Sequence, residues 1–149
     1  MGLREVFDNL VRLETVLWNA LDARLRKEFA VTMGSLDVLL VIESTEACRV
    51  YDIANALAIT VGGASQGVDR LERQGRIVRR PNPDDRRSSL VELTPAGRDL
   101  LAAAGEVFDD ELGKHLRDPI SAGALARFDT TLAALRAAAQ DQRPEGNAS

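Results

Sequence analysis

The first thirty residues carry apolar side chains at intervals of three and four positions, which is the period of an amphipathic α-helix. The stripe consists of Val6, Leu10, Leu13, Leu17, Leu21 and Leu25. We expect one long helix from about Leu3 to Phe29, with an apolar face that packs against another surface.

Two short helices are predicted next. Ser35 suits the N-cap of the first, which runs through Ile42 with three leucines facing inward. The polar run Ser44–Ala47 ends it. Apolar residues at helical spacing then indicate a second helix over Val50–Leu57.

A fourth helix follows after a tight turn. Thr60 suits its N-cap, and the helix runs from Val61 to about Gln74. Gly75 suits the position after the helix end, where the backbone turns left-handed. Five aliphatic residues are expected to join this helix and the preceding one through a shared core: Val50, Ile53, Leu57, Val68 and Leu71.

The period then changes to that of a short β-hairpin. Arg76–Arg80 and Ser89–Leu93 read as the strands, and Pro81–Asp85 has the composition of a turn. Two short helices, a tight turn and a hairpin together predict a winged helix-turn-helix.

Helical patterns resume behind the hairpin. Thr94 and Pro95 suit the N-cap and first position of a helix that ends before Asp118-Pro119. Ser121 is expected to cap a last helix, with Leu125, Phe128, Leu132 and Leu135 at strict spacing. The predicted fold is therefore mainly α with a small β-hairpin wing, and terminal helices flank the winged unit.

Charge is segregated along the chain. Asp69–Arg87 contains seven arginines and four acids, a local net charge of +3, whereas the whole chain carries −4 and the remainder therefore −7. A compact basic segment on an acidic chain is typical of a protein that meets a polyanion with one face. The alternative is an ordinary solvated loop.

Composition excludes several classes. The 149 residues suit one domain, and neither a membrane-spanning apolar run nor a secretory leader is visible, so we expect a cytoplasmic protein. Cys48 and His115 are the only residues of their types, so neither a disulfide framework nor a histidine-based metal site is expected. No cofactor fingerprint or nucleophile–base pair appears, and we predict no enzyme.

Specific motifs resemble the MarR family of bacterial transcriptional regulators. They are the segment Val68-Asp-Arg-Leu-Glu-Arg-Gln-Gly, the wing Arg79-Arg-Pro-Asn-Pro-Asp-Asp-Arg-Arg-Ser and the following Leu93-Thr-Pro-Ala-Gly-Arg. The resemblance spans Leu3 to about Ala139. It implies a homodimer that binds a palindromic operator in double-stranded DNA, usually as a repressor, and that a small phenolic or acidic ligand often releases.

The resemblance also assigns wing contacts. Asp85 and Arg87 match the family's wing pair, in which the carboxylate orients the arginine and the arginine enters the minor groove. Arg86 is expected to add a groove or phosphate contact, and Arg79 and Arg80 to lie near phosphates. A purely structural ion pair between Arg87 and Asp85 is the alternative.

Helical spacing places further candidates on the helix that follows Thr60. Thr60, Ser65, Gln66 and Arg70 face the groove or cap the helix start, and Gln66 can pair with adenine. Asp69 and Arg73 have the spacing of an ordinary intrahelical pair.

Glycines depart from the family pattern here. Gly62, Gly63 and Gly67 stand where Ser, Thr and Leu are common, and each interior glycine costs about 1 kcal/mol against alanine. Such a helix is either loosely ordered or held by tertiary packing. Gly62 and Gly63 would also let the backbone approach a phosphate. We expect less base discrimination from this helix and more from the wing and DNA shape.

Four segments are expected: a dimerisation helix over 1–34, the winged DNA-binding domain over 35–94, C-terminal dimerisation helices over 95–139 and a disordered tail over 140–149. The surplus apolar stripes at both ends favour a dimer over a monomer.

As a ligand site, the resemblance suggests Trp18, Asp37 and Arg73. Each residue also has a structural interpretation: Trp18 as a core residue, Asp37 as a partner of the helix dipole, and Arg73 as a phosphate contact or salt bridge.

Two other functions remain open from the sequence. One is a winged-helix module that docks a protein and has no ligand response. The other is a redox-responsive regulator through Cys48, although peroxide-sensing members carry their cysteine near the start of the first helix.

Overall fold

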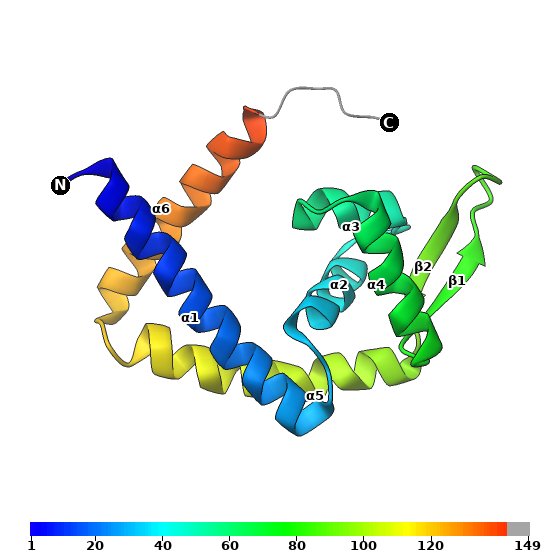
Figure 1. Cartoon of the computed structure of the whole chain (residues 1–149), viewed down its shortest axis with the longest axis horizontal. Coiled ribbons are helices and arrows are strands. Elements are labelled where there is room, and N and C mark those ends of the chain that lie inside the picture. The colour runs from blue at the N-terminus through cyan, green and yellow to red at the C-terminus, as the bar shows by residue number, and fades with distance from the viewer. Residues whose placement is uncertain (143–149) are drawn as a thin grey trace. The chain divides into compact units, whose positions relative to one another are not determined.

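The computed structural model describes residues 1–142 (Figure 1). Its elements are α1 (Leu3–Phe29), α2 (Met33–Ser44), α3 (Val50–Leu57), α4 (Val61–Arg73), β1 (Ile77–Pro81), β2 (Ser89–Leu93), α5 (Pro95–Leu112), the π-helical turn η1 (Gly113–Arg117) and α6 (Ala122–Asp141). The described residues form two compact units, one of residues 1–109 and one that begins at residue 110. The fold class predicted from the sequence is confirmed.

Three of the four predicted N-caps are confirmed. The Oγ1 of Thr60 accepts a hydrogen bond from the Gly63 N–H at 3.0 Å, and Thr94 and Ser121 cap α5 and α6 in the same way. Gly75 adopts a φ of 73°, the left-handed backbone expected beyond the end of α4.

The start of α2 differs from the expectation. Thr32, not Ser35, is the N-cap, and its Oγ1 accepts a hydrogen bond from the Ser35 N–H at 3.0 Å. A second, carboxylate cap comes from α1, because Asp22 accepts a hydrogen bond from the Met33 N–H at 2.8 Å. That bond and the neighbouring Arg26 lower the pKa of Asp22. Ser35 is instead buried in the first turn.

The hairpin is antiparallel, and its register runs from Ile77 opposite Leu93 to Pro81 opposite Ser89. Its first strand begins at Ile77, one residue later than predicted. The Val91 N–H donates to the carbonyl of Cys48 at 2.8 Å, which ties the middle of β2 to the loop between α2 and α3.

The core of the first unit lies where α2, α3 and α4 pack together. Leu36, Leu39, Ile53, Val68 and Leu71 are almost fully buried there. The predicted core residues Val50 and Leu57 are only half-buried. This packing anchors α4 through one face and leaves its other face in solvent.

Two helices keep large apolar surfaces exposed. In α1 only Leu21 and Leu25 are buried, whereas its first half exposes Leu3, Val6, Phe7, Leu10, Val11 and Val16. The 20-residue helix α6 buries none of its residues, and Leu135 is 60% exposed. The described helices include none with the length and hydrophobicity of a membrane span. Residues 143–149 of the predicted tail lie outside the described part, and α6 continues to Asp141.

The turn between α4 and β1 is fastened to the start of α5. The Thr94 hydroxyl donates to the carbonyl of Gly75 at 2.6 Å, and the Thr94 N–H donates to the carbonyl of Arg76 at 3.1 Å. Gly97 is buried in the first turn of α5, where a Cβ atom would overlap the Arg76 carbonyl oxygen. This close approach requires glycine.

We therefore expect Gly97→Ala to lower the free energy of unfolding by about 1–3 kcal/mol in urea denaturation, because the backbone contact leaves no room for a methyl group. Gly105 is the matched control in the same helix, since a Cβ there meets no atom within 4 Å. Gly105→Ala should raise the stability by up to about 1 kcal/mol. Equal effects at the two positions would contradict the packing described here.

Candidate nucleic-acid interface

The solvent face of α4 presents two polar side chains to water. Gln66 and Arg70 are exposed and four residues apart, so they lie one above the other on the helix. The opposite face is buried through Ala64, Val68 and Leu71. Ser65, also a predicted groove residue, is half-buried between the two faces. The exposed face can therefore meet a flat or grooved partner without disturbing the core.

The three glycines do not interrupt α4, which is continuous from Val61 to Arg73. Gly67 faces α2, and a Cβ there would lie 3.7 Å from a methyl group of Val38. Gly62 has open space around its Cβ position, whereas at Gly63 a Cβ would come within 3.1 Å of the Thr60 hydroxyl. Of the two predicted states, the structure has the helix held by packing.

Hydrogen bonds from the side chains of Asn82 and Asp85 shape the tip of the wing. The side chain of Asn82 accepts from the Asp84 N–H at 3.0 Å and donates to the Ser88 hydroxyl at 3.0 Å. The carboxylate of Asp85 accepts from the Arg87 N–H at 2.9 Å. Asp85 therefore holds the backbone at Arg87, and within residues 1–142 no ion pair joins their side chains.

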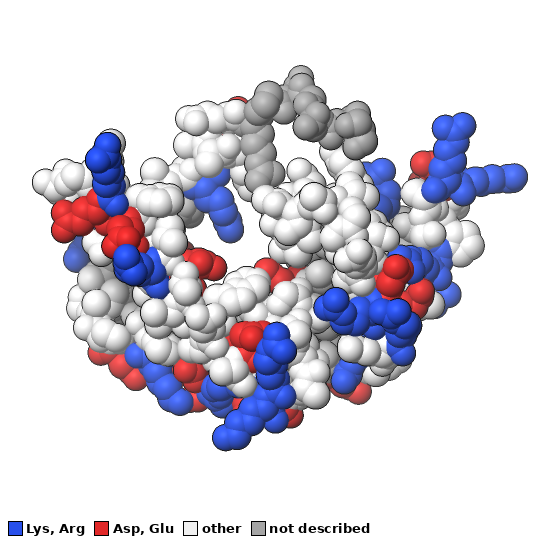
Figure 2. All heavy atoms as spheres, in the orientation of Figure 1, with Lys and Arg blue, Asp and Glu red and all other residues white. Residues whose placement is uncertain are grey.

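Arg86 and Arg87 project from this tip. Both are exposed, and neither guanidinium has a hydrogen bond or ion pair within residues 1–142. Figure 2 shows basic side chains extending into solvent from the hairpin end. Two unpaired guanidinium groups on a shaped loop are suited to phosphates or a narrow groove.

Arg79 is held differently. Its Nη2 lies 2.6 Å from Asp69 Oδ1 and its Nη1 lies 3.0 Å from Glu72 Oε1, while its backbone N–H donates to Glu72 at 3.2 Å. The hydrogen bond to Asp69 is the main cause of the raised pKa of Arg79. We call this contact the Arg79 clasp, because it joins β1 to α4.

Arg80 is also paired, with Glu92 across the hairpin at 2.6 Å. The two arginines predicted as phosphate neighbours thus have carboxylate partners. The expected pair between Asp69 and Arg73 is not formed in the described part of the chain, because Asp69 faces the wing and binds Arg79 instead. The contact of Asp69 and Glu72 with Arg79 of the wing is therefore the feature of this surface that the sequence analysis missed.

Arg49 is a further basic residue next to the wing. It precedes α3, pairs with Asp52 at 3.2 Å and stacks on Tyr51 with 5.9 Å to the ring centre. Arg49 and Asp85 both line a groove between the start of α3 and the wing loop. The sequence offered one signal for this arrangement, namely that Arg49 stands three positions before Asp52 at the start of a predicted helix.

Comparison with known proteins identifies the fold and its family. Residues 31–89 match the sequence model of the MarR family. An HTH-type transcriptional regulator of Bacillus cereus (strain ATCC 14579) is 33% identical over 102 residues, which cover 65% of this chain and 69% of that protein. The chain belongs to the MarR family. The multiple antibiotic resistance protein MarR of Escherichia coli K12 is 26% identical over 102 residues, which cover 68% and 71%.

Solved MarR-family structures share the fold. Sco3205 from Streptomyces coelicolor, in complex with DNA, has a TM-score of 0.81 at 21% identity, with 95% of this chain and 88% of that chain covered. CouR from Rhodococcus jostii RHA1, bound to p-coumaroyl-CoA, has a TM-score of 0.77 at 24% identity, with 87% and 90% covered. BpsR of Bordetella bronchiseptica, whose DNA binding is regulated by 6-hydroxynicotinic acid, has a TM-score of 0.78 at 20% identity, with 89% and 98% covered.

A cavity of about 390 Å³ lies where the MarR resemblance suggested a ligand site. Trp18 and Asp37 line it as expected, but its arginine is Arg70, whereas Arg73 does not line it. The helical phase of α4 explains the difference, because Arg70 follows Gln66 and Gly63, which also line the cavity. Burial raises the pKa of Asp37.

Cys48 lies in the core, 2% exposed, and burial raises its pKa to about 11. A thiol in that state is protonated at neutral pH and is a poor nucleophile. This environment argues against the redox-responsive alternative.

His115 lies 3.2 Å from Glu111, and within the described residues no group of three or more potential metal ligands occurs.

The Arg79 clasp generates a prediction about local stability. Arg79→Met should raise amide hydrogen exchange in β1 and β2 about threefold, because the wing loses an interaction of roughly 0.5–1 kcal/mol with α4. Arg80→Met is the matched control, since the Arg80–Glu92 pair lies within the hairpin and does not reach α4. If both variants loosened the hairpin equally, the clasp would have no special role.

Proposed function

We propose that this MarR-family protein is a homodimeric repressor that binds a palindromic operator in double-stranded DNA and that a small aromatic acid releases. The observation that carries the proposal is the pairing pattern of the arginines within residues 1–142. Arg79 and Arg80 bind carboxylates, whereas Arg70 on α4 and Arg86 and Arg87 on the wing keep free guanidinium groups. The free cations are thus presented outward from α4 and the wing tip.

The proposed contacts follow from those positions. Gln66 and Arg70 meet base edges or phosphates in the major groove, and the start of α4 at Thr60, Gly62 and Gly63 approaches the backbone. Ser65 is half-buried and would contact DNA at the edge of the exposed face of α4. Arg87, placed by Asp85, enters the minor groove with Arg86 beside it. Arg79 and Arg80 act as positioning residues.

Glycine content supports a shift of specificity toward the wing. Gly62, Gly63 and Gly67 offer no side chain to base edges, so α4 reads fewer positions directly. We propose that DNA shape, sensed by the wing arginines in the minor groove, supplies a larger share of the specificity.

The exposed apolar faces of α1 and α6 support dimerisation. Leaving this much large apolar surface in water is costly, and a second copy with two-fold symmetry would cover it. We therefore propose residues 1–34 and 95–139 as dimerisation segments around the winged domain 35–94. Two-fold symmetry would then set the two copies of α4, the helix proposed to enter the major groove, about one DNA turn apart.

The cavity lined by Trp18, Asp37 and Arg70 supports ligand control. The positive end of α2 also borders it, through Thr32 and Ser35, which favours an anionic group. Arg70 and Gln66 belong both to the cavity and to the proposed DNA face. A bound acid would hold these side chains away from DNA, and release follows from that competition. The acid that regulates DNA binding by BpsR, 6-hydroxynicotinic acid, agrees with this class of effector.

DNA binding is tested with a fragment selected by the purified protein from genomic DNA. The logarithm of the affinity should fall steeply and linearly with the logarithm of the salt concentration. Arg87→Ala should weaken binding about tenfold or more. The control is Arg12→Ala, since Arg12 is exposed and paired with Asp8 on α1. A flat salt response would favour the alternative of a protein-docking module.

Ligand binding is tested with para-hydroxybenzoate and the fluorescence of Trp18, the single tryptophan. Arg70→Gln should weaken the response about fivefold, whereas Arg73→Gln should leave it unchanged. Because charged Asp37 repels a carboxylate, the affinity should fall as pH rises through the raised pKa of Asp37. Asp37→Asn should remove that pH dependence. A stronger effect of Arg73→Gln would contradict the assignment.

A further inference from the structure

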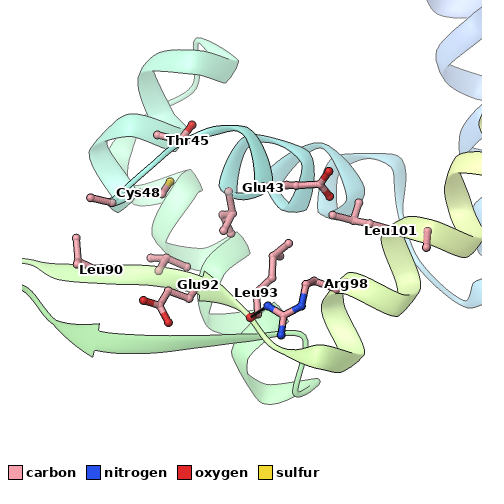
Figure 3. A pocket seen from close by; sticks show the side chains of 12 residues that line it. Glu43, Thr45, Cys48, Leu90, Glu92, Leu93, Arg98 and Leu101 are labelled. Carbon is pink, nitrogen blue, oxygen red and sulfur yellow. Dashed lines mark hydrogen bonds between the residues drawn. The ribbon is translucent and has the colours of Figure 1, made fainter.

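A second cavity lies at the other end of α2 from the one that Trp18 lines. It has a volume of about 640 Å³ and is bounded by the end of α2, by β2 and by the start of α5 (Figure 3). This volume is within the range of small-molecule sites. Neither the DNA contacts nor the proposed effector site uses it.

The lining combines an apolar floor with charged walls. Ile42, Val91 and Leu101 are buried and form the apolar part. Glu43 comes from α2 and Arg98 from α5, so the two charges stand on different walls. No ion pair joins them in the described part of the chain.

Glu43 occupies an electrostatically unfavourable position. It lies in the last turn of α2, where the helix dipole is negative and where no basic residue offsets it. Its carboxylate forms no hydrogen bond or ion pair with the rest of residues 1–142. The α2 wall of the cavity is therefore negative through both the side chain and the helix end.

Arg98 mirrors this arrangement. It lies in the first turn of α5, at the positive end of the dipole, and that turn contains no acid. Its Nη1 donates to the carbonyl of Leu93 at 3.0 Å, and Figure 3 shows the side chain reaching back to the end of β2. That bond uses one of the five N–H groups of the guanidinium.

The third charged residue of the lining is already neutralised. Glu92 binds Arg80 at 2.6 Å on the hairpin. The cavity thus presents one negative and one positive wall, each with a charge placed against its own helix dipole. Both side chains are exposed, so a ligand in the cavity can reach them, and a ligand of opposite charge would offset the unfavourable dipole interaction at each helix end.

We propose that this cavity binds a small amphipathic zwitterion. A cationic nitrogen would pair with Glu43, an anionic oxygen would pair with Arg98, and an apolar spacer would cover the floor of Ile42 and Leu101. This inference goes beyond the proposed DNA-binding function, and its test requires no DNA.

The probe is para-(aminomethyl)benzoate, a rigid zwitterion. It is compared with para-methylbenzoate and para-methylbenzylamine, which keep the ring and one charge each. Binding is followed through the backbone amide signals of Thr45 and Leu93, while the Trp18 indole signal reports the other cavity. The zwitterion should bind about fivefold or more tightly than either analogue.

Two variants test the charged walls. Glu43→Gln should reduce the affinity of the zwitterion to that of para-methylbenzoate, and Arg98→Gln should reduce it to that of para-methylbenzylamine. Glu46→Gln is the matched control, because Glu46 is an exposed acid of the adjoining loop that does not line this cavity. Circular dichroism checks that each variant is folded.

Two results would overturn the proposal. One is equal binding of the three probes to the wild-type protein. The other is a loss of affinity in Glu46→Gln as large as that in Glu43→Gln, which would reveal nonspecific attraction to surface acids.

Discussion

The guanidinium of Arg79 lies between the carboxylates of Asp69 and Glu72, and the position of the wing relative to α4 depends on this contact. Each ion pair is partly exposed and individually weak, but both share one planar group and a backbone hydrogen bond from the same residue. The opposite strand is attached as well, because the Val91 N–H donates to the carbonyl of Cys48 and Val91 lies directly opposite Arg79 in the register. Both strands of the hairpin are therefore held at the same level, below the tip.

This arrangement divides the arginines by task. Those along β1 neutralise acids and hold elements together, and those at the tip remain free for a partner. The acids Asp69 and Glu72 of this basic segment therefore reduce its net charge and also join β1 to α4 through Arg79. Helix α2 organises the remaining chemistry, since its positive end borders the cavity with Trp18 and its negative end borders the cavity with Glu43.

Local chemistry explains what could be predicted from the sequence. Caps such as Thr60, and the hydrophobic period of α1 and α4, act within a few residues and are visible in the chain. The predicted start of α2 was wrong, because the local cap is Thr32 and not Ser35, and only the added bond from Asp22 to the Met33 N–H depends on a residue eleven positions away. The roles of Arg79 and Arg70 depend on where the hairpin returns and on how α4 is rotated against α2. Both are features of the tertiary structure, which the spacing of residues along the sequence does not predict.

The most direct test compares the salt dependence of DNA binding in Arg79→Met and Arg87→Met with that of the wild-type protein. If Arg79 positions the wing, its variant binds DNA more weakly while the slope of log affinity against log salt stays the same. Arg87→Met should reduce the magnitude of that slope by about 0.9 for each phosphate that Arg87 neutralises. An equal reduction in Arg79→Met would mean that Arg79 contacts DNA directly, which would contradict this account.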